Sequence, residues 1–217
     1  MRTHPTSRQH FLAMGSLGVG LVVWLLTIVT GPRLGETPSN APQPSDQQAV
    51  RLSELPPAYA EMVYWAVGLF QRAELELPEL EISYVGLDAK GCDWRLGGHR
   101  RVGDLSQITL CETPNLHIRE HLVLHEIAHA YLEHHLAPNR KARFKSLRGW
   151  TEWWNYDAAP WHENGAEQAA EILVWGLIDR PVGIVRIYQN TCAELDAGYR
   201  ILTGRPPLNG FNDFCDG

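Results

Sequence analysis

The stretch HEIAHAYLEHH, residues 125–135, contains two histidines four residues apart, with a glutamate directly after the first. On a helix, residues i and i+4 lie one above the other, so both imidazoles can reach one metal ion. A glutamate at the second position of this motif can act as a general base beside the metal. The stretch therefore predicts a helical metal site, with His125 and His129 as ligands and Glu126 as the catalytic residue.

A catalytic zinc site needs three protein ligands, and His135 is the nearest candidate for the third. In the H-E-x-x-H-x-x-G-x-x-H motif, a glycine allows the chain to turn before the last histidine. This chain has Leu132, a good helix former, at the glycine position. On a continuous helix, His135 would lie about 15 Å from His125 along the axis, too far to share the metal. His135 is therefore rejected as a ligand.

A second predicted helix, residues 163–178, supplies three other candidates, Glu163, Glu167 and Glu171. Glu167 and Glu171 are one helical turn apart and share a face, and small alanines between them permit close approach to another helix. Glu167 is the preferred third ligand. Glu171 is then placed to accept a hydrogen bond from the other ring nitrogen of a ligand histidine. Spacing alone leaves Glu171 and Glu163 open as alternative ligands.

The periodicity of the apolar residues along the chain predicts an α+β domain with a small sheet, and both motif helices belong to it. A tryptophan-rich connection between the two motif helices is expected to form a hydrophobic cap, or else a substrate-binding wall. Within that connection, Tyr156 and His162 are candidate oxyanion stabilisers. The predicted elements are a helix over 56–73, a strand over 80–87, a hairpin over 92–111 ending in a strand at 106–110, helices over 116–135 and 163–178, and a helical segment over 183–204.

The N-terminal part of the chain differs in character from the rest. Residues 11–31 are free of charged side chains and long enough to cross a bilayer as a helix. The run exceeds the usual apolar region of a secretory signal, so an uncleaved anchor is preferred to a cleaved signal peptide. The expected organisation is a cytoplasmic tail over residues 1–10, the anchor over 11–31, a Pro/Ser-rich linker over 32–50 and one domain over 51–217.

All four cysteines follow the predicted anchor, which suits two disulfides in an oxidising compartment. The preferred pairs are Cys92–Cys111 and Cys192–Cys215, since each joins neighbouring segments, and four buried free thiols are the alternative. The N-terminal charges favour a cytoplasmic N-terminus and thus an extracytoplasmic domain in the cell membrane. The net charge of −6 and the lack of a long basic tract argue against nucleic acid as a partner.

With these residues in view, the chain resembles the gluzincin branch of zincin metallopeptidases. HEIAHAYLEHH followed by AEQAAEILVWGL is most similar to ImmA/IrrE-type metallopeptidase domains, and the resemblance covers roughly residues 115–178. It implies a zincin fold and a Zn²⁺ ion bound by His125, His129 and Glu167. The anchor and the cysteines differ from the cytosolic regulatory peptidases of that family.

The resulting hypothesis is a membrane-anchored zinc metallopeptidase that hydrolyses peptide or protein substrates with a metal-activated water, Glu126 being the general base. Two alternatives stay open. One is a zincin-fold binding module with a structural or vestigial metal site. The other is a zinc hydrolase that acts on cell-wall material.

Overall fold

The computed structural model describes residues 49–86, 92, 96–149, 152–154, 163–180, 182 and 191–208. All of them belong to the unit Asn40–Gly217. Within these residues, no helix combines the length and the apolar character needed to cross a bilayer. The predicted anchor, residues 11–31, lies outside the described part of the chain.

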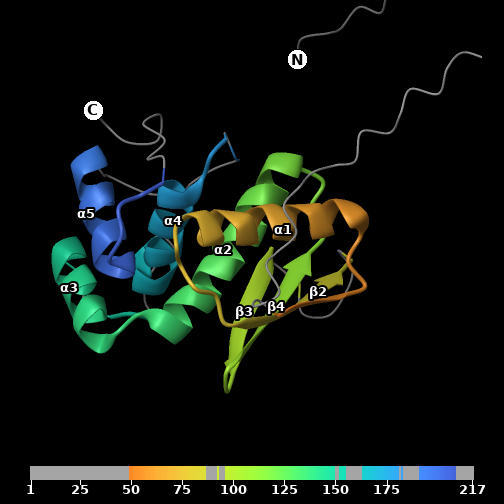
Figure 1. Cartoon of the computed structure of the whole chain (residues 1–217), viewed down its shortest axis with the longest axis horizontal. Coiled ribbons are helices and arrows are strands. Elements are labelled where there is room, and N and C mark those ends of the chain that lie inside the picture. Colours follow the sequence, from red (N-terminus) through yellow and green to blue (C-terminus); the bar gives the residue numbers. More distant parts are fainter. Residues whose placement is uncertain are drawn as a thin grey trace, which may run out of the picture. The chain divides into compact units, whose positions relative to one another are not determined.

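The described residues form an α+β domain with one mixed sheet of four strands and five helices (Figure 1). The strands lie in the order β1-β2-β4-β3, with β1, β2 and β4 parallel and β3 antiparallel to β4. The elements are β1 (Val50–Ser53), α1 (Pro57–Arg72), β2 (Glu79–Val85), β3 (Gly97–Val102), β4 (Leu105–Cys111), α2 (Leu116–His135), α3 (Pro138–Arg148), α4 (Gly165–Leu177) and α5 (Cys192–Thr203).

The sheet has one face in the core. Leu80 and Ile82 of β2 are buried, as are Ile108 and Leu110 of β4, while the residues between them are partly exposed. This alternation is the period-2 pattern of a sheet that packs on one side. Helix α2 packs against β3, β4 and α1, so the motif helix lies directly on the sheet.

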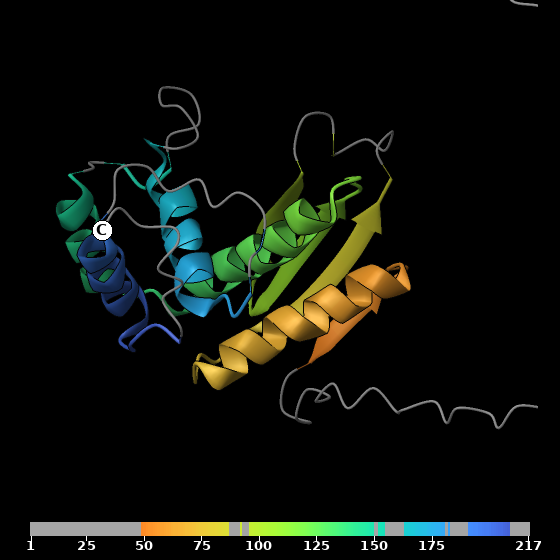
Figure 2. The ribbon, with the colours of Figure 1, turned by 90° about the horizontal axis from the view of Figure 1, so that it is seen from above.

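Helices α3, α4 and α5 lie beside α2, on the side away from the strands (Figure 2). Helix α4 packs against α2 and α5, and α3 packs against α5. Every residue of α4 is buried, including Glu167, Gln168 and Glu171. A helix that is buried all round must satisfy its polar side chains internally. Two of these polar side chains meet histidines of α2, as described below.

Most of the elements expected from the sequence are present. Helix α2 starts directly after Asn115, whose side chain accepts hydrogen bonds from the backbone N–H groups of His117 and Ile118. The hairpin of β3 and β4 is confirmed. Strand β1 was not predicted, and it begins at Val50, the last residue of the expected linker. The segment after α2, of mixed character in the sequence, contains the regular helix α3.

The expected disulfide between Cys92 and Cys111 is present, with 5.8 Å between the Cα atoms. It connects the segment before β3 to the end of β4. Cys192 is also disulfide-bonded. Its predicted partner, Cys215, lies outside the described residues.

Close packing of α4 on α5 depends on Gly176. A Cβ at this position would lie 2.1 Å from Cδ2 of Tyr199, a fully buried ring. We expect Gly176→Ala to lower the free energy of unfolding by about 2 kcal/mol or more, because overpacking outweighs a gain of about 1 kcal/mol in helix propensity. Denaturant titration measures the change.

Gly68 in α1 is the matched control for this prediction. A Cβ there would meet only Nη1 of Arg72, at 3.8 Å. Gly68→Ala should therefore leave stability unchanged or raise it by up to about 1 kcal/mol. Equal effects of the two substitutions would contradict the argument from packing.

Candidate metal centre

Helix α2 brings two histidine nitrogens together on its inner face. His125 and His129 are one turn apart, and both are buried. Their Nε2 atoms lie 3.0 Å from each other, with the rings nearly perpendicular. The i, i+4 spacing therefore directs both imidazoles at one point.

Helix α4 contributes a third potential ligand atom, Oε2 of Glu167, which lies close to both histidine nitrogens. Oε2 of Glu167 lies 3.0 Å from Nε2 of His125 and 3.2 Å from Nε2 of His129. Asn164 caps α4 through the N–H of Ala166, which places Glu167 in the first turn, where the helix dipole favours a carboxylate. Sequence reasoning preferred Glu167 over its neighbours, and the fold brings this residue to the two histidines.

The three atoms suit a tetrahedral metal ion. A metal held at about 2.0–2.1 Å by nitrogen and oxygen ligands requires these ligands to lie about 3.3 Å apart. The observed triangle, with sides of 3.0–3.2 Å, is close to that requirement. His125, His129 and Glu167 could therefore hold a metal ion, with a fourth position left for another ligand.

Glu171 lies behind this triangle and supports it. Its Oε1 lies 3.0 Å from Nδ1 of His125, and its Oε2 lies 2.9 Å from Nε2 of His121. A carboxylate beside Nδ1 favours the proton on that nitrogen and so leaves the Nε2 lone pair free for a metal. Burial alone would raise the pKa of Glu171, but the charges and hydrogen bonds of His121 and His125 lower it to about 2. His121, His125 and Glu171 also form a second group close enough to hold a cation.

Glu167 and Glu171 stabilise a second proton on the His125 ring. Burial alone would lower the pKa of His125, but its bonds with Glu167 and Glu171 raise it well above its ordinary value. Burial likewise would raise the pKa of Glu167, yet the two histidines bring it well below its usual range. A metal ion must displace this proton, so metal affinity is expected to fall as the pH is lowered.

Glu126 stands beside the triad and is not part of it. Its side chain is buried, and burial raises its pKa in spite of the opposing charges of His125 and His129. A raised pKa brings a carboxylate closer to the range in which a general base works at neutral pH. One of its oxygens, Oε1, faces Gly97 of β3, where an added Cβ would lie 3.0 Å from it.

Two further residues lie near His129: His99, which the sequence analysis did not single out, and Trp154 of the tryptophan-rich connection. His99 of β3 stacks on His129, with ring centroids 6.4 Å apart, and hydrogen-bonds Ser106 at 2.9 Å. Trp154 lies 5.7 Å from the ring of His129 and is 38% exposed. The sequence offered Trp154 only as one of several tryptophans, and no local pattern relates His99 to α2.

The burial of His99 leads to a prediction about pH. Burial, reinforced by His129 and His134, lowers the pKa of His99 from 6.5 to about 3. Between these values, the unfolded chain binds a proton at His99 that the folded protein does not bind. Stability of the metal-free protein should therefore decline as the pH falls from 6.5 towards 3.

His99→Gln removes this titrating group and should make the decline less steep, by at most about 1.4 kcal/mol per pH unit. Denaturant titrations of both metal-free proteins across the pH window measure the two slopes. Identical slopes would contradict the prediction.

The other predicted residues do not join the triad. Glu163 is exposed and belongs to neither His/Glu group found among the described residues. His135 stacks on Tyr131 near the end of α2, in agreement with its rejection as a ligand. Tyr156 and His162 lie outside the described residues. Trp153 is buried against Phe144, as a hydrophobic cap would be.

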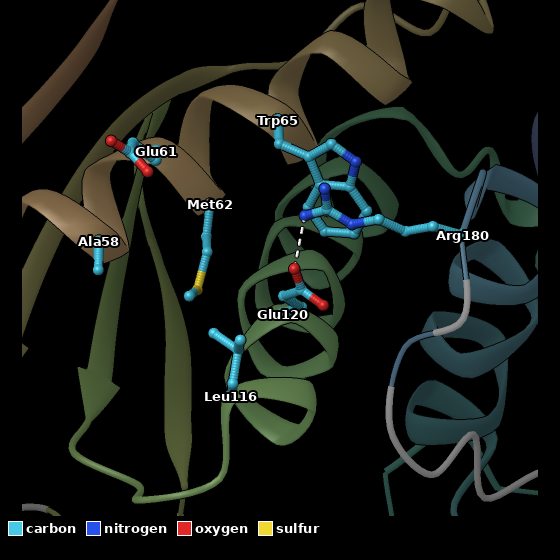
Figure 3. A pocket seen from close by; sticks show the side chains of 7 residues that line it. All are labelled: Ala58, Glu61, Met62, Trp65, Leu116, Glu120 and Arg180. Atoms are coloured by element: carbon cyan, nitrogen blue, oxygen red, sulfur yellow. Dashed lines mark hydrogen bonds and ion pairs between the residues drawn. The ribbon is translucent and has the colours of Figure 1, made fainter.

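A cavity of about 320 Å³ lies elsewhere, between α1 and the first turns of α2 (Figure 3). Arg180 closes one side, where it stacks on Trp65 and forms an ion pair with Glu120 at 2.6 Å. None of the triad residues lines this cavity. The buried donor atoms of the triad, rather than this cavity, therefore define the candidate site. The remaining lining residues are Ala58, Glu61, Met62 and Leu116.

Comparisons with known proteins leave the site to be interpreted from its own geometry. No protein-family model matches the chain, and no curated protein or solved structure is significantly similar to it.

Proposed function

We propose that the protein is a zinc-dependent metallopeptidase of the gluzincin type. The observation that carries the proposal is the convergence of Nε2 of His125, Nε2 of His129 and Oε2 of Glu167 within 3.2 Å, beside the buried Glu126. Two histidines and one glutamate are a ligand set of catalytic zinc sites that keep one position open. Structural zinc sites usually have four protein ligands.

A zinc ion in this triad would supply a Lewis acid that polarises a carbonyl and lowers the pKa of water. Glu126 takes the proton of the attacking water on its carboxylate and passes it to the leaving amine. Glu171 would keep the proton of His125 on Nδ1 and so leave Nε2 free to bind the ion. Neutral His99 and the indole of Trp154 lie beside the His129 ring.

The proposal includes a single-pass anchor at residues 11–31 and an extracytoplasmic domain. The Cys92–Cys111 disulfide supports the second part, because disulfides persist in oxidising compartments and are rare in the cytosol. In that setting, peptide or protein substrates reach the site from outside the cytoplasm.

The test is hydrolysis of a mixed peptide library by the full-length, detergent-solubilised protein. We expect cleavage that stops when a chelator removes the metal and returns when Zn²⁺ is added back. Mass spectrometry of the products locates the cleaved bonds.

Cell-wall fragments tested in parallel distinguish the peptidase from a hydrolase of other bonds. Zinc binding without hydrolysis of either substrate class would contradict the proposal and favour the binding module. The exposed indole of Trp154 beside His129 would then be a contact for a partner.

A further inference from the structure

Strand β3 runs alongside α2, and alternate residues of the strand contact successive turns of this helix. Its alternate residues Gly97, His99 and Arg101 are paired with Leu110, Ile108 and Ser106 of β4, which belong to the buried face of the sheet. Side chains directly opposite each other in an antiparallel pair point to the same face. These three positions of β3 therefore face the helices.

Each of the three positions meets a different part of α2. Position 97 lies against Glu126, His99 stacks on His129, and Nη1 of Arg101 donates to the carbonyl oxygen of Glu133 at 2.6 Å. That carbonyl is near the end of α2, where backbone acceptors lack helical partners. The His99–His129 stacking and the hydrogen bond from Arg101 thus fix the position of β3 along α2. In this position, residue 97 lies opposite Glu126.

The absence of a side chain at position 97 makes room for the carboxylate. A Cβ there would lie 3.0 Å from Oε1 of Glu126, 2.8 Å from Cδ1 of Leu122 and 3.1 Å from the backbone oxygen of Thr109. All three distances are shorter than ordinary van der Waals contact between such atoms. Any residue other than glycine would therefore have to displace the Glu126 carboxylate, the Leu122 side chain or the Thr109 carbonyl.

We propose that Gly97 is a positioning residue for Glu126: its backbone forms the wall that sets where the carboxylate lies beside the metal triad. This inference rests on the proposed function for its catalytic consequence. The steric part of the inference concerns the contact between position 97 and Glu126 and can be tested without any substrate.

The adjacent glycine gives a matched control. Gly98 lies on the opposite face of β3, and a Cβ there would meet no atom within 4 Å. Gly97→Ala and Gly98→Ala thus make the same chemical change in the same strand, and only the first encroaches on Glu126.

The kinetic experiment compares both variants in the zinc-loaded, full-length protein. We expect Gly97→Ala to lower kcat about 100-fold, because a displacement of about 1 Å at a reacting group can have this effect. KM and zinc content should stay the same, and Gly98→Ala should behave as the parent. A folded Gly97→Ala protein with parental kcat would overturn the proposal.

A stability cycle tests the steric part independently of activity. Gly97→Ala should lower Tm in the parent, and lower it less in a Glu126→Ala background, where the Cβ no longer meets the carboxylate. If Gly97→Ala alone fails to fold, a folded double variant would support the contact with Glu126. An equal Tm decrease in both backgrounds, or no folding in either, would overturn the steric claim and assign the crowding at position 97 to Leu122 and the Thr109 carbonyl.

The two experiments separate this inference from the proposed function. A parent protein that hydrolyses nothing would contradict the proposed function. The Tm coupling between positions 97 and 126 would still be measured, and it would support or overturn the steric claim.

Discussion

Glu126→Gln is expected to reduce peptide hydrolysis by about 100-fold to 10,000-fold, the usual contribution of a general base. Glutamine has nearly the same shape as glutamate, so it can occupy the space beside Gly97, but its amide cannot accept the proton of the attacking water. Since Glu126 is not one of the triad atoms, the zinc content should stay at the parental value. The measurement is kcat/KM together with metal analysis of the same sample.

Glu133→Gln is the control for this substitution. It makes the same chemical change on the same helix, at a partly exposed side chain outside both His/Glu groups. Activity close to that of the parent is expected. Full activity in Glu126→Gln would exclude Glu126 as the base, and loss of zinc in that variant would show that the substitution disturbs the site as a whole.

Glu167→Ala is expected to abolish stoichiometric zinc binding. The parent should bind one zinc ion per chain, and the variant keeps only the two histidine nitrogens. Glu171→Gln keeps all three ligand atoms and removes only the charge behind His125, so a smaller loss of affinity is expected, about 10–100-fold. Competition with a chromophoric chelator measures all three affinities.

His135→Ala is the control for metal binding, because His135 belongs to neither His/Glu group. Its affinity for zinc should equal that of the parent. Zinc retained at full affinity by Glu167→Ala, and lost by Glu171→Gln, would move the site to the second group, formed by His121, His125 and Glu171.

Local sequence determined most of the helices and the hairpin. Asn115 before a long apolar-periodic run sets the start of α2, and the turn at Gly103 connects two strands of alternating character. The i, i+4 spacing of His125 and His129 follows from helix geometry alone. Each of these features depends on residues that are close together in the chain, which is why the sequence predicts them.

Other features of the fold needed the tertiary structure. Strand β1 is only four residues long and gains its hydrogen bonds from β2, about thirty residues later in the chain. The side chains of Glu163, Glu167 and Glu171 are equivalent as ligands, and only the packing of α4 on α2 brings Oε2 of Glu167 to both histidines.

The same holds for the surroundings of the site. His99 lies beside His129, and Gly97 lies beside Glu126. Both contacts depend on the register of β3 on β4 and on the position of α2 over the sheet. The apolar periodicity of a strand or helix predicts which of its faces is buried. It does not predict which residues of two elements lie opposite each other. The sequence by itself thus determined the helix that carries the two candidate histidine ligands and Glu126, whereas the approach of Glu167 to these histidines and of Gly97 to Glu126 was decided by packing between segments far apart in the chain.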